Sequence, residues 1–275
     1  MKRTQIIVVA FCFVLLIGLY FFGKTTKPKA DNAMPPVAQA PGGHAQPAVE
    51  ALDIEAYIKE VNGKVSDPAE KNKIENFTKA QSYKELAKEY QKLDKPLAVA
   101  YYIVKSANAE NNVKGYVGAG DYNSMLLQSA PDEKAQKFLI TNAVDCYKKA
   151  VDLDTANTDN KIRLAGAYME QGTQPMQGVL LLLEIVRRDS TNVDAQLMLG
   201  RFGLVSGQVD KAIARFEKIL YLQPQNSEAL YLLAQAYNAQ GNKQKAIDAL
   251  QKCKKVVKDP DAKKKIESEI ENLKK

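Results

Sequence analysis

The sequence of 275 residues contains no tryptophan and a single histidine, His44. Ser-His-Asp and Cys-His catalytic devices and histidine-based metal sites all need histidine, and His44 lies in a stretch rich in alanine, proline and glycine. Acid pairs such as Asp152 and Asp154 fall on predicted surfaces, whereas acid–base catalysis needs burial. We therefore expect no catalytic, cofactor or metal site, and a protein that is not an enzyme.

Cysteine is also scarce, with Cys12, Cys146 and Cys253 and no CxxC motif. Cys12 lies in the apolar N-terminus. The other two fall on the inward faces of predicted helices that are far apart along the chain, which argues against a disulfide between them. We interpret both as small buried apolar residues.

The body of the chain lacks a surplus of positive charge, although the net charge is +7. Met1–Lys29 holds five basic residues and no acid, and without it 39 − 5 = 34 basic residues stand against 32 acidic ones. Gln251–Lys275 carries nine lysines and five acids, so the middle is close to neutral. A nucleic-acid-binding protein would be expected to show a basic stripe, so no nucleic-acid partner is expected.

The lysine-rich run QKCKKVVKDPDAKKK is typical of a solvated helix face, with contact to an acidic partner or to lipid headgroups as the alternatives.

One long apolar run stands out, Ile6–Phe22, which has 17 residues and no charge. A helix of that length spans roughly 26 Å, enough for a thin bilayer. A cleaved signal peptide is the alternative, but no Ala-x-Ala site follows the run, and Phe21 and Phe22 suit a cleavage point poorly. We expect residues 1–29 to form a membrane anchor with basic flanks. The short N-terminal tail favours a cytoplasmic N-terminus and an extracytoplasmic main part, which in a bacterium is periplasmic.

Residues 30–49 are rich in alanine, proline and glycine and cannot bury enough apolar surface to fold. They are predicted to form a disordered linker. Order begins with an amphipathic pattern at Glu50–Asn62, and Asp67-Pro68 is a helix-start signal for a second helix to about Lys79. We interpret residues 50–79 as N-terminal capping helices.

From there the chain repeats itself. Ser227–Leu250 reads as two amphipathic helices joined at Gly241-Asn242. Thirty-four residues earlier, Leu199-Gly200 stands at the place of Leu233-Ala234 and Phe216 at that of Leu250. The same pattern returns around Leu164-Ala165 and around Leu86-Ala87. Neither helix of such a pair can bury its apolar stripe alone, so the period predicts stacked helix pairs.

This pattern resembles the tetratricopeptide repeats, whose 34-residue unit has Leu-Gly, Tyr, Ala, Phe and Pro at fixed positions. The resemblance implies an all-α, right-handed solenoid of about four to five units over residues 80–260. The N-terminal transmembrane helix expected from Ile6–Phe22 precedes it, and the apolar residues Ile266, Ile270 and Leu273 on one side of a polar helix predict a capping helix at residues 261–275. No unit has the family's tryptophan, and Gly203 stands where a tyrosine is expected. The match is poor at Val113–Asp154, where about ten extra residues occur and where the glycines of GYVGAGDYN are interpreted as points of close helix approach.

In the resembled family, the concave groove lined by the first helix of each pair receives a peptide from a partner. The side chains predicted to point into it are Lys84, Lys88, Gln91, Ile162, Gly166, Met169, Leu197, Arg201, Leu204, Tyr231, Gln235 and Asn238. Of these, the peptide-groove candidates are Ile162, Met169, Leu197, Arg201, Leu204, Tyr231, Gln235 and Asn238, although Leu197 and Leu204 also suit packing on neighbouring helices.

Two hypotheses follow. The first is a membrane-tethered interaction module that binds a peptide segment of a protein partner during assembly, secretion or maturation of envelope proteins. It resembles single-anchor tetratricopeptide proteins beside translocation or cytochrome-maturation machinery, or organelle import receptors. The second is a structural subunit of a stable membrane complex that uses its convex or cap-helix surfaces. Self-association, and so a homo-oligomer, stays open under both.

Overall fold

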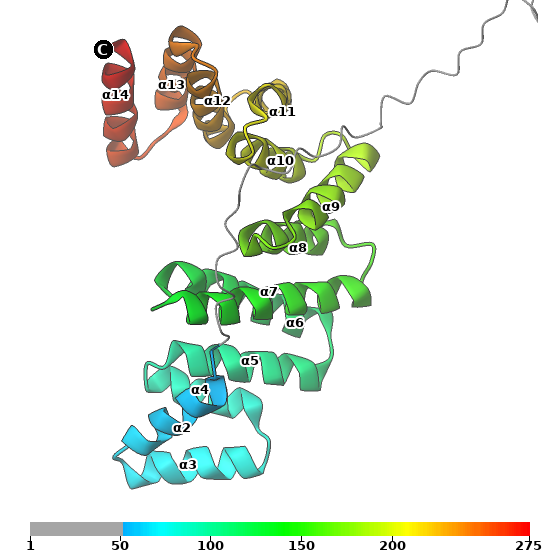
Figure 1. Ribbon diagram of the computed structural model, residues 1–275, viewed down its shortest axis with the longest axis vertical. Coiled ribbons are helices and arrows are strands. Elements are labelled where there is room, and N and C mark those ends of the chain that lie inside the picture. The colour runs from blue at the N-terminus through cyan, green and yellow to red at the C-terminus, as the bar shows by residue number, and fades with distance from the viewer. Residues whose placement is uncertain (1–51) are drawn as a thin grey trace, which may run out of the picture. The chain divides into compact units, whose positions relative to one another are not determined.

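The computed structural model describes residues 52–275, and over this range the chain forms α-helices without a β-strand (Figure 1). The anchor predicted for residues 1–29 and the linker predicted for residues 30–49 lie outside the described residues. Within residues 52–275, no helix is long and apolar enough to span a bilayer.

The helices are α2 (Ile54–Lys64), α3 (Pro68–Lys79), α4 (Tyr83–Lys92), α5 (Pro96–Glu110), α6 (Val113–Leu126), the short 3₁₀ helix η1 (Leu127–Ser129), α7 (Glu133–Leu153), α8 (Thr158–Gln171), α9 (Pro175–Arg188), α10 (Val193–Val205), α11 (Val209–Leu222), α12 (Ser227–Ala239), α13 (Lys243–Val256) and α14 (Pro260–Lys274).

The helices between α4 and α13 are organised as five pairs, α4/α5, α6/α7, α8/α9, α10/α11 and α12/α13, whose members pack on each other. In four of the pairs a turn of three residues joins the helices, which makes them antiparallel neighbours. The turns of the last two pairs contain Gly207 and Gly241 with φ of 74° and 82°, a backbone conformation that glycine adopts without strain. Five pairs agree with the number of units predicted from the 34-residue period.

The starts of the first helices also repeat. Asn157, Asn192 and Asn226 precede α8, α10 and α12, and each side-chain Oδ1 accepts a hydrogen bond from the backbone N–H three residues on, at 3.0, 2.9 and 2.9 Å. Because the first turn of a helix has N–H groups without partners inside the helix, each asparagine fixes where its helix begins.

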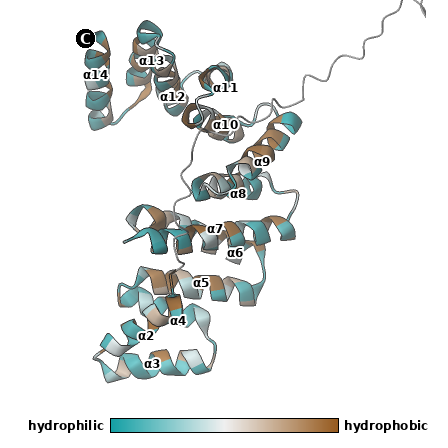
Figure 2. Cartoon of the chain, in the orientation of Figure 1, coloured by the Kyte–Doolittle hydropathy of each residue, from teal (hydrophilic) through white to brown (hydrophobic). Residues whose placement is uncertain are grey.

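A small residue meets a large side chain where two helices of a pair approach closely. A Cβ atom added at Gly200 on α10 would lie 2.4 Å from the ring of Phe216 on α11, and one at Gly120 on α6 would lie 2.5 Å from the ring of Tyr147 on α7. Phe216 is fully buried. Gly120 of α6 therefore serves helix packing, as interpreted from the sequence, whereas a Cβ atom at Gly118 would have no atom within 4 Å. Figure 2 shows the matching pattern of apolar stripes on otherwise polar helices.

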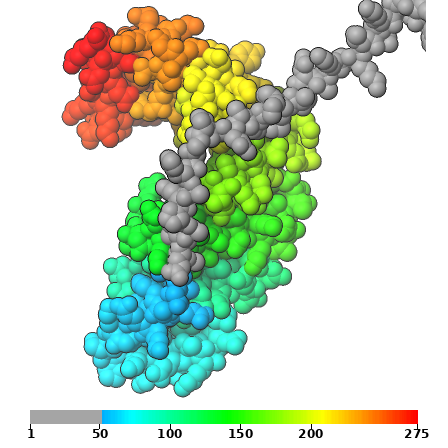
Figure 3. Space-filling view, viewed as in Figure 1, coloured from blue at the N-terminus to red at the C-terminus, as the bar shows by residue number. Residues whose placement is uncertain are grey.

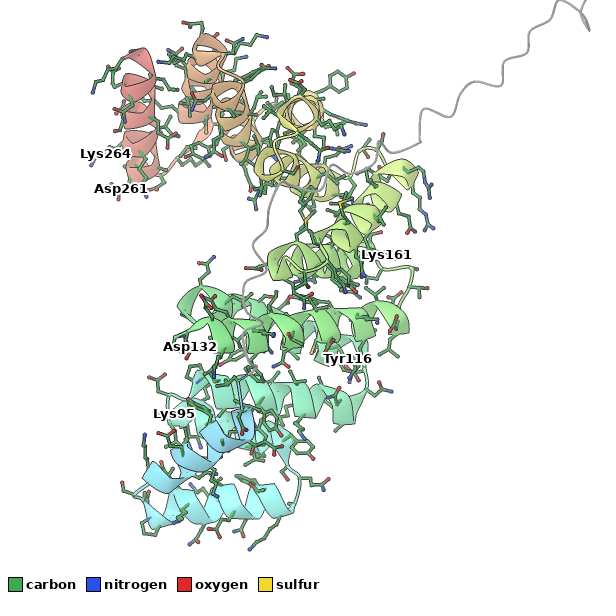
Figure 4. All side chains as sticks on the ribbon, in the orientation of Figure 1. Lys95, Tyr116, Asp132, Lys161, Asp261 and Lys264 are labelled. Atoms are coloured by element: carbon green, nitrogen blue, oxygen red, sulfur yellow. The ribbon has the colours of Figure 1, made fainter. Side chains whose placement is uncertain are left out.

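The irregular unit at residues 113–154 arises from the length of α7. This helix has 21 residues, whereas α9, α11 and α13 have 14 each. Asp132, labelled in Figure 4, caps its start by accepting from the N–H of Ala135 at 2.8 Å. The additional N-terminal turns bury Ala135 and Leu139 in a cluster with Leu97 of α5. Most of the extra residues thus extend a second helix, and the others lengthen the connection before it, which contains η1.

Further helices pack at both ends of the paired region. The helix α3 packs on α4, and α2 packs on α5. A hydrogen bond also joins α4 to α2, since the Tyr90 hydroxyl of α4 donates to Asn62 Oδ1 of α2 at 2.7 Å. The helix α3 begins at Pro68, with Asp67 as its N-cap. At the other end, α14 packs on α13 through Ile266 and Ile270.

Cys146 and Cys253 are buried and unpaired, as predicted. Burial raises the pKa of the Cys146 thiol to about 11. The thiol therefore stays protonated near neutral pH and acts as an apolar packing group.

A pair of alanine substitutions in α6 tests the close approach of α6 and α7. Gly120→Ala is expected to destabilise the protein by about 1–3 kcal/mol, since the new methyl group overlaps the Tyr147 ring. Gly118→Ala is the matched control, because it lies in the same helix with no atom within 4 Å, and it should stabilise by about 0.5–1 kcal/mol. Urea unfolding measures both. Equal effects would contradict the packing role of Gly120.

Candidate peptide-binding surface

The candidate groove residues lie on the first helices α8, α10 and α12, which contact one another in that order. On α12 the buried side chains Leu230, Leu233, Ala234 and Tyr237 form one face, and Gln235 and Asn238 are exposed on the other. The amphipathic pattern therefore separates packing residues from solvent-facing ones, and the two amides belong to the solvent-facing group.

Arg201 of α10 is exposed but has a partner. Its guanidinium donates to the carboxylate of Glu228, which lies in the first turn of α12. The pair joins two consecutive first helices across the predicted groove. Both side chains are about half exposed, so the attraction is weakened by solvent and a ligand carboxylate can compete for the arginine.

Tyr231 of α12 is half-buried and contacts the last helix. Its hydroxyl donates to Glu269 Oε1 of α14 at 2.7 Å. This hydrogen bond, together with partial burial, raises the pKa of the Tyr231 phenol. Tyr231 therefore helps to hold α14, and a substitution there would change the packing of α14 as well as the surface.

The four apolar candidates are partly buried against the core. Leu197 and Leu204 pack on the cluster that contains Phe216, and Ile162 and Met169 pack on the cluster that contains Leu182. They contribute the apolar base of the surface, while Arg201, Gln235 and Asn238 contribute its polar groups.

The sequence reasoning missed Met198. A Cβ atom added at Gly166 of α8 would lie 2.9 Å from Met198 Cε, so the methionine of α10 fills the space beside the glycine. A glycine on one first helix and a long, flexible side chain on the next are the sequence features that could have indicated this contact.

An ion pair joins the two helices of the third unit. Lys161, labelled in Figure 4, lies at the start of α8 and pairs with Glu184 of α9 at 3.6 Å.

A hollow lies in the N-terminal units, between two first helices and one second helix. It has a volume of about 360 Å³ between α4, α5 and α6, and its lining includes Lys84, Ile103, Lys114 and Gly118. Lys84, which the sequence predicts to point outward from α4, lines this hollow together with Lys114 of α6. Within residues 52–275, no group of three His, Cys, Asp or Glu side chains could hold a metal ion.

Comparisons with known proteins agree with the repeat pattern. The family model "Tetratricopeptide repeat" matches residues 203–265. A curated relative, the peroxisomal targeting signal receptor of Candida albicans, is 31% identical over 100 residues, which cover 36% of this chain and 17% of the relative. The matched segment thus spans less than a fifth of that relative's length.

Solved structures are similar in fold. A thermophilic TPR protein from Thermus thermophilus aligns with a TM-score of 0.50 and 18% identity, covering 68% of this chain and 97% of that one. The MamA protein aligns with a TM-score of 0.48 and 20% identity, covering 64% of this chain and 90% of that one. The likeness to the Thermus protein supports the helical-repeat fold, and at this identity it concerns the fold alone.

The exposed pair Arg201–Glu228 is expected to contribute little to stability. Arg201→Ala and Glu228→Gln should each lower the free energy of unfolding by less than about 1 kcal/mol, because exposed ion pairs are weak. Urea unfolding of the two variants and of the parent protein measures this. A loss of several kcal/mol from either would show that the pair is a structural link between α10 and α12 that a ligand could not displace.

Proposed function

We propose that this chain is a membrane-tethered protein-interaction module in which the first-helix face of α8, α10 and α12 binds a peptide segment of a partner protein. The partner's segment carries an apolar side chain, for the base formed by Leu197 and Leu204, and a carboxylate or backbone carbonyl, for Arg201. The process is the assembly, secretion or maturation of envelope proteins.

The observation that carries this proposal is that α12 has one buried, apolar face and one exposed, polar face. Its inner stripe is ordinary repeat core, while Gln235 and Asn238 are exposed on the same helix as Glu228, the partner of Arg201. Amides and a guanidinium can bond a peptide backbone or carboxylate without a preformed deep pocket. The named relative is a receptor for a targeting signal, which is in keeping with peptide recognition by such repeats.

The membrane tether in this proposal comes from the sequence. The apolar run Ile6–Phe22 has the length of a bilayer-spanning helix, and residues 30–49 have the composition of a flexible spacer. We propose that the N-terminus is cytoplasmic and that the repeats are extracytoplasmic. Such a tether would hold the binding face near the membrane while leaving it free to reorient.

Site-specific photo-crosslinking tests the binding face. A photoreactive residue at Gln235 or at Asn238 is expected to capture a partner, and one at Ala214, which is exposed on the second helix α11, is not.

Two substitutions in the chain that carries the photoreactive residue at position 235 should change capture in opposite directions. Arg201→Glu should abolish capture by repelling the carboxylate, while Glu228→Gln should maintain or increase it by releasing Arg201. Mass spectrometry of the crosslinked adducts measures the amount of captured partner for each position and each variant.

Both variants break the same ion pair, but Arg201→Glu also places two carboxylates side by side. Urea unfolding of each variant therefore separates a loss of stability from a loss of binding. Capture from Ala214 and none from Gln235 or Asn238 would refute the first-helix face. It would favour instead a structural subunit that associates through second-helix surfaces, including with further copies of itself.

Protease accessibility tests the orientation. On intact cells that lack an outer barrier, an added protease is expected to remove a tag placed at the C-terminus, since the repeats would lie outside the membrane. Detergent-permeabilised cells serve as the control for tag cleavage. A tag that is protected until permeabilisation would place the repeats on the cytoplasmic side.

A further inference from the structure

The last two helices enclose a hollow that the first-helix face does not include. It has a volume of about 630 Å³, and its walls come from α13 and α14, which adjoin each other in Figure 3. Lys254 and Lys255 line it from α13, and Lys263 and Lys274 line it from α14. Two acids, Glu267 and Glu271, also line the hollow, so the lining has four positive and two negative charges, a net charge of 4 − 2 = +2.

The acids of this region already have partners within the chain. Glu267 pairs with Lys254 across the hollow, and Glu271 pairs with Lys274 at 2.7 Å. The remaining three are used elsewhere. Glu269 accepts from Tyr231, Asp259 caps the start of α14, and Asp261 lies near Lys264 at 3.7 Å on an exposed part of α14 (Figure 4). None of these five carboxylates forms an ion pair with Lys255 or Lys263.

Two lysines of the lining therefore have no ion-pair partner. Lys255 and Lys263 form no ion pair with any group in residues 52–275, and they line the hollow from different helices, α13 and α14. We propose that this hollow, called here the basic hollow, binds an acidic segment of a partner protein, with carboxylates meeting Lys255 on one side and Lys263 on the other. The site is separate from the first-helix face and does not depend on the function proposed for it.

The structure favours a protein segment over a lipid surface as the occupant. A helix that lies on a membrane needs a large apolar face turned toward the lipid. In α14 the apolar residues Ile266 and Ile270 are buried against α13, and Leu273 is half-buried. In addition, lysines on two facing walls can surround a chain segment, whereas a flat bilayer cannot enter between them.

The length of the α14 wall suits a short segment. Lys263 and Lys274 are 274 − 263 = 11 residues apart on α14, which corresponds to about 16 Å at the rise of a helix. An extended chain covers that length with about five residues. A peptide with several closely spaced glutamates therefore has the length of this wall.

Binding of a fluorescent glutamate-rich peptide to the full chain tests the proposal by fluorescence anisotropy, with the chain held in phosphatidylcholine vesicles. The parent chain should bind this peptide and not its lysine-rich counterpart. The double variant Lys255→Glu/Lys263→Glu should weaken binding at least about tenfold, because two attractions become repulsions. The matched control, Lys252→Glu/Lys265→Glu, changes the net charge equally at exposed positions of the same helices outside the hollow, and it should change binding less than about twofold.

Three results would overturn the proposal. The parent chain could fail to bind the glutamate-rich peptide, or the two double variants could weaken it equally, which would indicate a diffuse attraction. In the third, vesicles that contain phosphatidylglycerol would abolish peptide binding to the parent chain, which would identify lipid headgroups as the occupant. All four altered lysines lie outside the core, and circular dichroism of each variant confirms that the helices are retained.

Discussion

Close contact between the two helices of each pair is the constraint on which the remaining structure depends. A single amphipathic helix cannot bury its apolar stripe, and the pair can do so only if the backbones approach closely. Gly200 against Phe216 and Gly120 against Tyr147 provide that approach in two units, and Ala234 packs in one cluster with Leu250 in the last complete pair. Once the stripes are buried, the opposite sides of the first helices must face solvent or a partner.

This constraint also explains how the chain tolerates its irregular unit. The contact between Gly120 and Tyr147 is kept, while the additional residues extend α7 at its N-terminal end, away from that contact. The new turns bury Leu139 with Leu97 of α5, so the extension becomes part of the core. An insertion that lengthens a helix on its free side preserves the pairing, because it leaves the spacing around the contact unchanged.

Ion pairs and hydrogen bonds between units make the polar surface. Arg201 meets Glu228, and Tyr231 meets Glu269, so each joins a first helix to a helix of the next part of the chain. These contacts leave some groups satisfied and others available. Gln235 and Asn238 stay exposed on the first-helix face, and Lys255 and Lys263 stay unpaired in the basic hollow. The two proposed binding surfaces are therefore defined as much by the partners already taken within the chain as by residue type.

The helix pairs and their core stripes could be predicted from the sequence, and their number to within one, since a 34-residue period and the spacing of Leu230, Leu233 and Tyr237 are properties of the linear chain. The repeated caps Asn157, Asn192 and Asn226 follow the same period and could have been read from it. Only the tertiary structure decided that Tyr231 serves α14 and that Arg201 is paired with Glu228. The physical reason is that these partners lie 38 and 27 residues away and belong to other helices. Periodicity shows which side of a helix is polar, whereas the packing of neighbouring helices decides which polar groups meet.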